Sequence, residues 1–215
     1  MEIVSVNIGQ KQHYDWRNGT DSAIVKHSVN CPLRLKLTGF VGDEQADLKV
    51  HGGADKAVLV IPAVNYALFG IDRPFGFLGE NLTLDGADES EIQLGDHLQV
   101  GEVLLEVSQP RSPCWKLNEV TGDRQFLARY AESGHVGFYC RVLQTGYIGP
   151  GASAVRMPSD LPSLSIKTLF LAKHRLASEA DWQAIQLALD HPALSEAWRQ
   201  ALQKLLERKN EMARG

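Results

Sequence analysis

Apolar and polar residues alternate along the first part of the chain, and glycines follow the alternating segments. Val4, Val6 and Ile8 are separated by polar residues, and three leucines within residues 33–37 are spaced in the same way. A period of two is typical of strands with one buried face. Residues 57–61 are apolar without interruption, which predicts a strand that is buried on both faces.

Further strands and two short helices are expected before residue 158. Residues 98–107 predict a hairpin with a Gly-Glu turn, and residues 139–143 predict another strand. Short helices are expected at residues 62–69, with a proline in the first turn, and at residues 121–132. Many short strands joined by glycine turns favour a barrel or sandwich over a doubly wound sheet. We therefore expect a mainly β, barrel-like domain over residues 1–157.

The pattern changes to a helical period in residues 158–215, which open on two closely spaced prolines. One helix is expected at residues 164–173. Two more are expected to be capped by Ser178 and Ser195 and separated at His191 by a His-Pro break. Such a three-helix domain is marginal by itself, so we expect it to pack on the barrel or on a partner.

The length and composition of the chain exclude several classes of protein. The 215 residues suit one large domain, or one domain with a small appendage. A net charge of -4 argues against a chain built to bind polymeric nucleic acid, although it allows a local basic pocket. No apolar run approaches the roughly 20 residues of a membrane helix. The first residues lack the features of a signal peptide, so we expect a cytoplasmic protein without membrane contact.

The cysteines are few and odd in number, which excludes a disulfide framework and suits a reducing compartment. They are Cys31, Cys114 and Cys140. Cys114 lies in residues 108–117 (SQPRSPCWKL), where two prolines stiffen the loop and Arg111 and Lys116 bracket the thiol. Nearby positive charge favours a thiolate, which is both a nucleophile and a soft metal ligand. The other two cysteines lie in strand-like segments and are expected to be packing residues.

Other segments combine glycines with polar or charged residues. They are residues 42–47 (GDEQAD), 51–58 (HGGADKAV), 79–83 (GENLT) and 137–143 (GFYCRVL). His51 has no second His or Cys at the spacing of a zinc site. Asn81 suits either a polar ligand or the backbone of a turn. Arg141 suits either an anionic ligand or the exposed face of an edge strand. Taken singly, each segment favours a structural role.

Taken together and in this order, and with Gly95-Asp96, the motifs resemble the MOSC family, named after the C-terminal domain of molybdenum cofactor sulfurases. Within the family they resemble the bacterial YiiM branch, linked to resistance to 6-N-hydroxylaminopurine. The resemblance covers about residues 1–155, and the tail is similar to the three-helix appendage of that branch. It implies a barrel that binds a molybdenum-pyranopterin cofactor, with the thiolate of Cys114 as metal ligand. The residues that it places near the cofactor are His51, Asn81, Arg111, Ser112, Lys116 and Arg141.

The activity that the resemblance implies is reduction of N-hydroxylated compounds such as 6-N-hydroxylaminopurine. Molybdenum would take the oxygen of the N–OH group, and two electrons and two protons would release it as water. Cys114 would anchor the metal, and His51 or Asp47 is expected to deliver protons. Arg111 and Arg141 would bind the phosphate of the cofactor.

Electrons are expected from a separate protein, because the chain has neither an iron–sulfur cysteine motif nor a dinucleotide fingerprint. That donor would be a flavin or iron–sulfur reductase. The substrate would be an N-hydroxylated base or amine, and the chain would act as a monomer or homodimer. Two other functions stay open: sulfur transfer through a persulfide on Cys114, and a non-catalytic carrier of the cofactor.

Two positions depart from the family pattern. His135 stands where an arginine or lysine is expected, which could alter the anion pocket. Residues 149–151 (Gly-Pro-Gly) stand where a Gly-Asp is expected, which is expected to alter only a turn.

Overall fold

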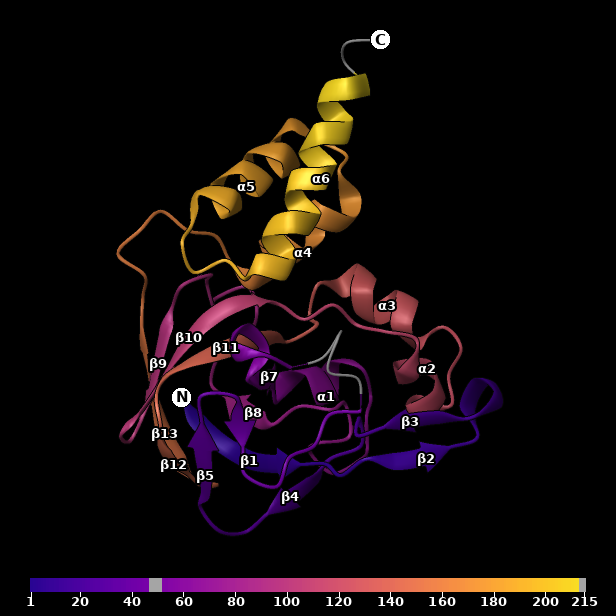
Figure 1. The fold of residues 1–215 in the computed structure, drawn as a ribbon, viewed down its shortest axis with the longest axis vertical. Coiled ribbons are helices and arrows are strands. Elements are labelled where there is room, and N and C mark those ends of the chain that lie inside the picture. The colour runs from indigo at the N-terminus through magenta and orange to yellow at the C-terminus, as the bar shows by residue number, and fades with distance from the viewer. Residues whose placement is uncertain (47–51, 213–215) are drawn as a thin grey trace.

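The computed structural model describes residues 1–46 and 52–212 and contains a barrel with a helical tail (Figure 1). Seven strands close the barrel, because the first and the last of them pair with each other. In barrel order they are β13 (Ala152–Met157), β9 (His97–Val100), β10 (Val103–Pro110), β11 (Phe138–Gln144), β7 (Val58–Pro62), β8 (Leu82–Asp85) and β1 (Glu2–Ile8). β7 and β8 run parallel, and the other neighbours in the barrel run antiparallel. The expected mainly β, barrel-like fold is confirmed.

The barrel wall agrees with the hydrophobic pattern of the sequence. All five residues of β7 are buried, as the unbroken apolar run predicts. Their side chains face both ways, so Val58 and Val60 join the core inside the barrel, whereas Leu59 and Ile61 join a second core outside it. The predicted hairpin is formed by β9 and β10, with Val100 paired to Val103 across the turn.

Smaller strands extend the barrel. β4 (His27–Val29) pairs with β1, and a three-stranded sheet contains β12 (Gly146–Ile148), β5 (Leu33–Lys36) and β6 (Gly39–Phe40). β2 (Gln12–Tyr14) and β3 (Thr20–Ser22) form a separate hairpin with the short 3-10 turn η1 (Trp16–Asn18) at its tip. A second 3-10 turn, η2 (Ala54–Lys56), leads into β7.

Both helices expected within the barrel region differ from their predicted bounds. α1 covers only Val64–Leu68, and Pro62 completes β7 rather than opening the helix. The helix predicted at residues 121–132 is present as α3 (Phe126–Ser133), which begins later than predicted, and the preceding α2 (Lys116–Thr121) was not predicted. Gly122 separates them with a φ of 68°, a left-handed conformation that glycine adopts without strain and that ends α2.

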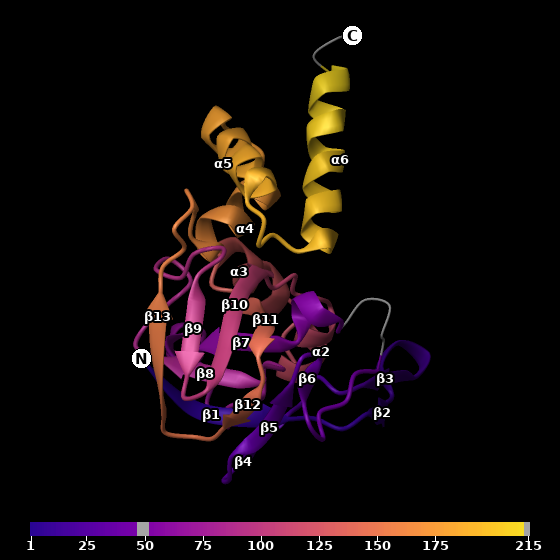
Figure 2. The same cartoon turned by 60° about the vertical axis from the view of Figure 1, so that its left-hand side comes forward.

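The tail contains three helices at one end of the barrel (Figure 2). They are α4 (Ile166–Arg175), α5 (Glu179–Asp190) and α6 (Glu196–Met212). Ser178 caps α5 in a reciprocal capping box with Asp181, and the hydroxyl of Ser195 accepts a hydrogen bond from the backbone N–H of Trp198. Within residues 1–46 and 52–212, the structure contains no helix that is long and apolar enough to cross a bilayer.

The tail and the outside of the barrel share one hydrophobic core. Phe170 of α4, Ile185 of α5 and Trp198 of α6 belong to the same buried cluster as Leu59 and Tyr130. Burial of these side chains stabilises the tail by about 1.5–3 kcal/mol for each large residue. The three helices therefore pack on the barrel, as their small size leads one to expect.

Polar contacts fix the same junction. The backbone N–H of Ser195 donates to the carbonyl of Ser108 at 3.0 Å, and its hydroxyl donates to Oε1 of Gln109 at 2.6 Å. The ring of His191 lies against Gly95, where an added Cβ would come within 2.2 Å of the ring. These contacts connect the start of α6 to the end of β10, which leads directly into the Cys114 loop.

One carboxyl group is buried in the barrel wall just before β8. Oε1 of Glu80 accepts hydrogen bonds from the hydroxyl of Tyr66 at 2.7 Å, the N–H of Gly76 at 2.7 Å and the hydroxyl of Thr83 at 3.1 Å. Oε2 has no hydrogen-bond partner within the described residues. Burial raises the pKa of Glu80, because the charged form loses its hydration.

Replacing Glu80 by glutamine is expected to change how stability depends on pH. Above the usual glutamate pKa, the folded protein holds a proton on Glu80 that the unfolded chain has lost, so its free energy of unfolding falls as pH rises. This contribution is at most about 1.4 kcal/mol per pH unit for one proton. The E80Q variant lacks this proton, so its free energy of unfolding should fall less than that of the parent protein between pH 4 and 8. Urea unfolding at several pH values measures both slopes, and equal slopes would contradict the prediction.

Candidate functional site

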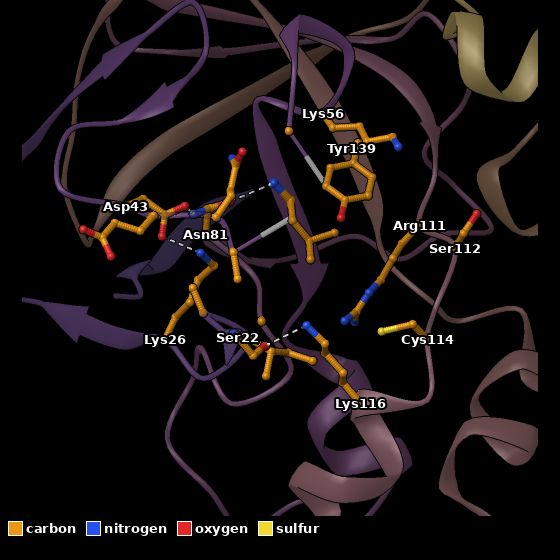
Figure 3. A pocket seen from close by; sticks show the side chains of 18 residues that line it. Ser22, Lys26, Asp43, Lys56, Asn81, Arg111, Ser112, Cys114, Lys116 and Tyr139 are labelled. Carbon is orange, nitrogen blue, oxygen red and sulfur yellow. Dashed lines mark hydrogen bonds and ion pairs between the residues drawn. The ribbon is translucent and has the colours of Figure 1, made fainter. Parts of the chain in front are cut away.

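A pocket lies between the Cys114 loop, the start of β7 and the segment that follows β6 (Figure 3). It encloses about 700 Å³, counting space open to solvent, which is within the range of small-molecule sites. Five of the residues predicted from the sequence line it. They are Asn81, Arg111, Ser112, Cys114 and Lys116.

Cys114 lies in the turn between β10 and α2. Its carbonyl accepts a hydrogen bond from the N–H of Leu117 at 3.0 Å, which fixes the loop against the helix that follows. The side chain is half-buried and lines the pocket. Cys31 is exposed, whereas Cys140 is buried in the barrel core, and burial raises the pKa of its thiol. Cys114 is thus the cysteine placed to meet a ligand.

Arg111 contributes a buried guanidinium to the wall of this pocket. The residue is only 5% exposed, and its Nη2 donates to the carbonyl of Leu78 at 2.8 Å. Nη1 is buried and has no hydrogen-bond partner within the described residues. Figure 3 shows the guanidinium turned toward the middle of the pocket, on the side of the Cys114 sulfur. A permanent cation in the wall of a pocket suits an anionic ligand.

Asn81 holds the opposite wall of the pocket. Its Oδ1 accepts from the N–H of Leu59 at 3.1 Å, and its Nδ2 donates to Oδ2 of Asp43 at 2.8 Å. Oδ1 of Asp43 in turn pairs with the ammonium group of Lys26, and both side chains are almost fully buried. The amide of Asn81 therefore positions the Asp43 carboxylate.

Lys116 connects the pocket to the β2–β3 hairpin. Its Nζ donates to the hydroxyl of Ser22 at 3.2 Å and to the carbonyl of Asp21 at 3.3 Å. Ser22 lines the same pocket. The lysine thereby closes one side of the site and leaves its positive charge near Cys114.

Sequence reasoning missed seven further polar residues that line the pocket. They are Ser22, Lys26, Asp43, Glu44, Gln45, Lys56 and Tyr139. Asp43, Lys56 and Tyr139 lie within motifs that were recognised, so a ranking of every polar residue in those motifs would have found them. Lys26 lies outside all of the motifs, and only the folded chain brings it to Asp43. Burial raises the pKa of Tyr139 and lowers that of Lys56.

Arg141 does not line this pocket. It lies on β11, where its guanidinium pairs with Oδ1 of Asp55 at 2.8 Å and with the carboxylate of Glu106. His51 and Asp47, the expected proton donors, lie outside the described residues. The structure thus gives Arg141 two carboxylate partners in place of the expected phosphate.

His135 also lies away from the pocket wall. Its Nδ1 contacts Oε2 of Glu89 at 2.9 Å, and its Nε2 contacts Nζ of Lys167 at 2.8 Å. This departure from the family pattern therefore joins the barrel to α4 instead of lining the anion pocket.

The donor set constrains the kind of metal group that fits. Within the described residues, no group of three or more His, Cys, Asp and Glu side chains could hold a bare metal ion. The pocket offers one thiol and the guanidinium of Arg111. That combination suits an anionic cofactor that brings most of the ligands of its own metal.

The fold and the site therefore define a β-barrel with a pocket that is lined by a thiol and a guanidinium. The chain belongs to the MOSC family, because its residues 47–155 match the MOSC domain model. It is 32% identical to the protein YiiM of Escherichia coli over 94% of this chain and 91% of that protein. The resemblance to the YiiM branch is confirmed.

A solved structure and a longer relative extend the comparison. The crystal structure of YiiM from Geobacillus stearothermophilus superimposes with a TM-score of 0.77 at 33% identity, covering 94% of this chain and 97% of that chain. A protein of Gibberella moniliformis named reductase is 34% identical over 67% of this chain and 27% of its own length.

Proposed function

We propose that this protein reduces N-hydroxylated compounds, such as 6-N-hydroxylaminopurine, with a molybdenum-pyranopterin cofactor. The single observation that carries the proposal is that the half-buried Cys114 thiol and the guanidinium of Arg111 line one pocket. MOSC domains generally bind molybdenum cofactors, and the reductase of Gibberella moniliformis matches this chain. Both similarities support the proposal.

Residues of this chain have distinct tasks in the proposed reaction. The Cys114 thiolate would hold the metal, and the guanidinium of Arg111 would bind the anionic part of the cofactor. When bound, the cofactor supplies two-electron reduction, so that an R–NHOH compound, two electrons and two protons give R–NH2 and water. Lys56 lies in the pocket, and burial lowers its pKa, so its Nζ would serve as a further proton donor in addition to the expected His51 and Asp47.

Electrons would come from a separate flavin or iron–sulfur reductase. The Gibberella moniliformis reductase matches this chain over only 27% of its own length, so most of that protein lies outside the matching part.

Purification from a host that makes the cofactor tests the proposal. We expect molybdenum and released pterin in about equal amounts, and turnover of 6-N-hydroxylaminopurine to adenine when a chemical reductant is supplied. Protein that stays free of molybdenum and inactive after loading would refute it. Bound cofactor without turnover would indicate a carrier, and a persulfide on Cys114 would indicate sulfur transfer.

A further inference from the structure

Asp55 lies where three parts of the molecule meet. It belongs to η2, and its Oδ1 accepts a hydrogen bond from Nε of Arg141 at 2.8 Å. Its Oδ2 accepts from the backbone N–H of Glu196 at 3.1 Å, and its carbonyl accepts from the hydroxyl of Ser108 at 2.6 Å. Strands β11 and β10 and the first residue of α6 therefore all hold this one residue of η2.

Arg141 bridges two carboxylates. Its Nη2 also contacts Oδ1 of Asp55 at 2.8 Å, and its Nη1 donates to the carboxylate of Glu106 on β10. The three nitrogens of the guanidinium thus all contact carboxylate oxygens, in the forked arrangement that suits arginine. The guanidinium therefore fixes the place of η2 on the barrel wall.

The residue after Asp55 is Lys56, whose side chain lines the Cys114 pocket. It also lines the neighbouring cavity next to the tail. Figure 3 shows the Lys56 side chain alongside the ring of Tyr139. η2 has only three residues, and a turn this short takes its position from the contacts that surround it. The contacts of Asp55 therefore determine where Lys56 lies.

Asp55 and Arg141 are partly exposed to solvent. Their side chains are 32% and 22% exposed, and that of Glu106 is 19% exposed. Ion pairs with this degree of exposure usually contribute little to the free energy of unfolding. Loss of the pair should therefore leave the chain folded, and its consequence is expected at the position of Lys56.

We propose that Arg141 and Asp55 are positioning residues, which hold Lys56 in the Cys114 pocket and connect it to the start of α6. The inference rests on the proposed function, because its catalytic consequence is proton delivery by Lys56. The ammonium group would give a proton to the oxygen that leaves as water and would regain it from solvent. Arg141 would thus act on the protonation of the substrate, whereas the family resemblance implied that it binds the cofactor phosphate.

An NMR experiment on the full chain without cofactor tests the positioning independently of turnover. Lysine is labelled with nitrogen-15, and the Nζ signal of Lys56 is assigned as the one that is absent from K56R. This signal should shift in both R141M and D55N, because η2 loses its contact with β11. R129M is the matched control. It breaks the 2.8 Å pair of Arg129 with Asp123, neither of which lines the two cavities, so it should leave the signal in place.

Steady-state kinetics of the cofactor-loaded protein tests the catalytic consequence. Proton transfer by a positioned side chain contributes about 100–10,000-fold to a rate, so kcat per bound molybdenum should fall about 10-fold or more in R141M. The KM for 6-N-hydroxylaminopurine and the molybdenum content should stay within about twofold of the parent. R141K, which keeps a positive charge between the carboxylates, should recover part of kcat. In the K56M background, R141M should cause no further loss, because Arg141 acts through Lys56.

The competing roles of Arg141 give different results. Loss of molybdenum in R141M with a normal kcat per bound metal would show that Arg141 binds the cofactor, and it would overturn the proposal. An unmoved Lys56 signal in R141M, or a full kcat in K56M, would overturn it as well. A shifted Lys56 signal in a protein without any reductase activity would refute the proposed function and leave the positioning of Lys56 by Arg141 standing.

Discussion

Replacing Cys114 by serine is expected to remove bound molybdenum and N-hydroxy reduction together. A serine hydroxyl is a hard donor that stays protonated at neutral pH, so it replaces a thiolate poorly as a ligand of a soft metal site. Loss of a residue that only orients a metal ligand costs about 10–100-fold in affinity or activity, so loss of the ligand itself should exceed about 100-fold. Metal analysis and the reductase assay measure the two effects on the same sample.

Cys31→Ser is the matched control for this substitution. Cys31 is exposed and does not line the Cys114 pocket, so its replacement should leave metal content and turnover within about twofold of the parent. A C114S protein that keeps both molybdenum and activity would show that another group holds the cofactor. The fold should survive in either variant, and circular dichroism checks this.

Replacing Lys26 by methionine is expected to give the largest loss of stability. The ammonium group of Lys26 pairs with Asp43, and the two side chains are 7% and 5% exposed. Without the lysine, the Asp43 carboxylate keeps the N–H of Gly9 at 2.8 Å and the amide of Asn81, but it loses its opposite charge. Breaking a buried pair on one side costs about 3–5 kcal/mol. Denaturant unfolding measures the loss.

A double substitution separates the unpaired charge from simple loss of packing. Combining Lys26→Met with Asp43→Asn removes both charges, so part of the stability lost in the single variant should return. A single-variant loss below about 1 kcal/mol would show that the pair behaves as a solvated surface ion pair. An equal loss in the single and double variants would assign the effect to packing.

Local patterns were enough to predict the elements whose own residues determine them. The unbroken apolar run of β7 and the β9–β10 hairpin carry their signal within a few residues. The capping serine of α5 and its reciprocal aspartate are three positions apart. α2 was not predicted, and the start of α3 was predicted too early, because the period alone does not show that Gly122 takes a left-handed conformation and ends α2.

Contacts between residues that lie far apart in the sequence could not be predicted from local patterns. The partners of Arg141 lie 86 and 35 residues away along the chain, so nothing near it indicates an ion pair. The β2–β3 hairpin is held by Lys116, which lies 94 residues beyond Ser22. Trp198 was predicted as part of a helix face. That its indole N–H is buried without a hydrogen-bond partner within the described residues could be seen only in the structure, where the tail packs on the barrel.

For the candidate site, the motif order placed Cys114 and four of its neighbours in one pocket, because the family resemblance carries long-range information that periodicity lacks. The resemblance could not show which of these side chains already form hydrogen bonds within the protein. The amide of Asn81 is hydrogen-bonded to Leu59 and Asp43, whereas Nη1 of Arg111 has no hydrogen-bond partner within the described residues. That distinction comes only from the hydrogen bonds.

The pairing of β1 with β13 has a consequence for synthesis on the ribosome. Glu2 lies opposite Ser153, so the first strand is made long before the strand that closes the barrel on it. At about 5–20 residues per second, the delay is about 10–30 s. During that interval β1 can pair with β4 and β8, but the sheet stays open because its last strand, β13, has not yet been made. α6 emerges later still, so the contacts of Ser195 with Ser108 and Gln109 form after the barrel strands have been made.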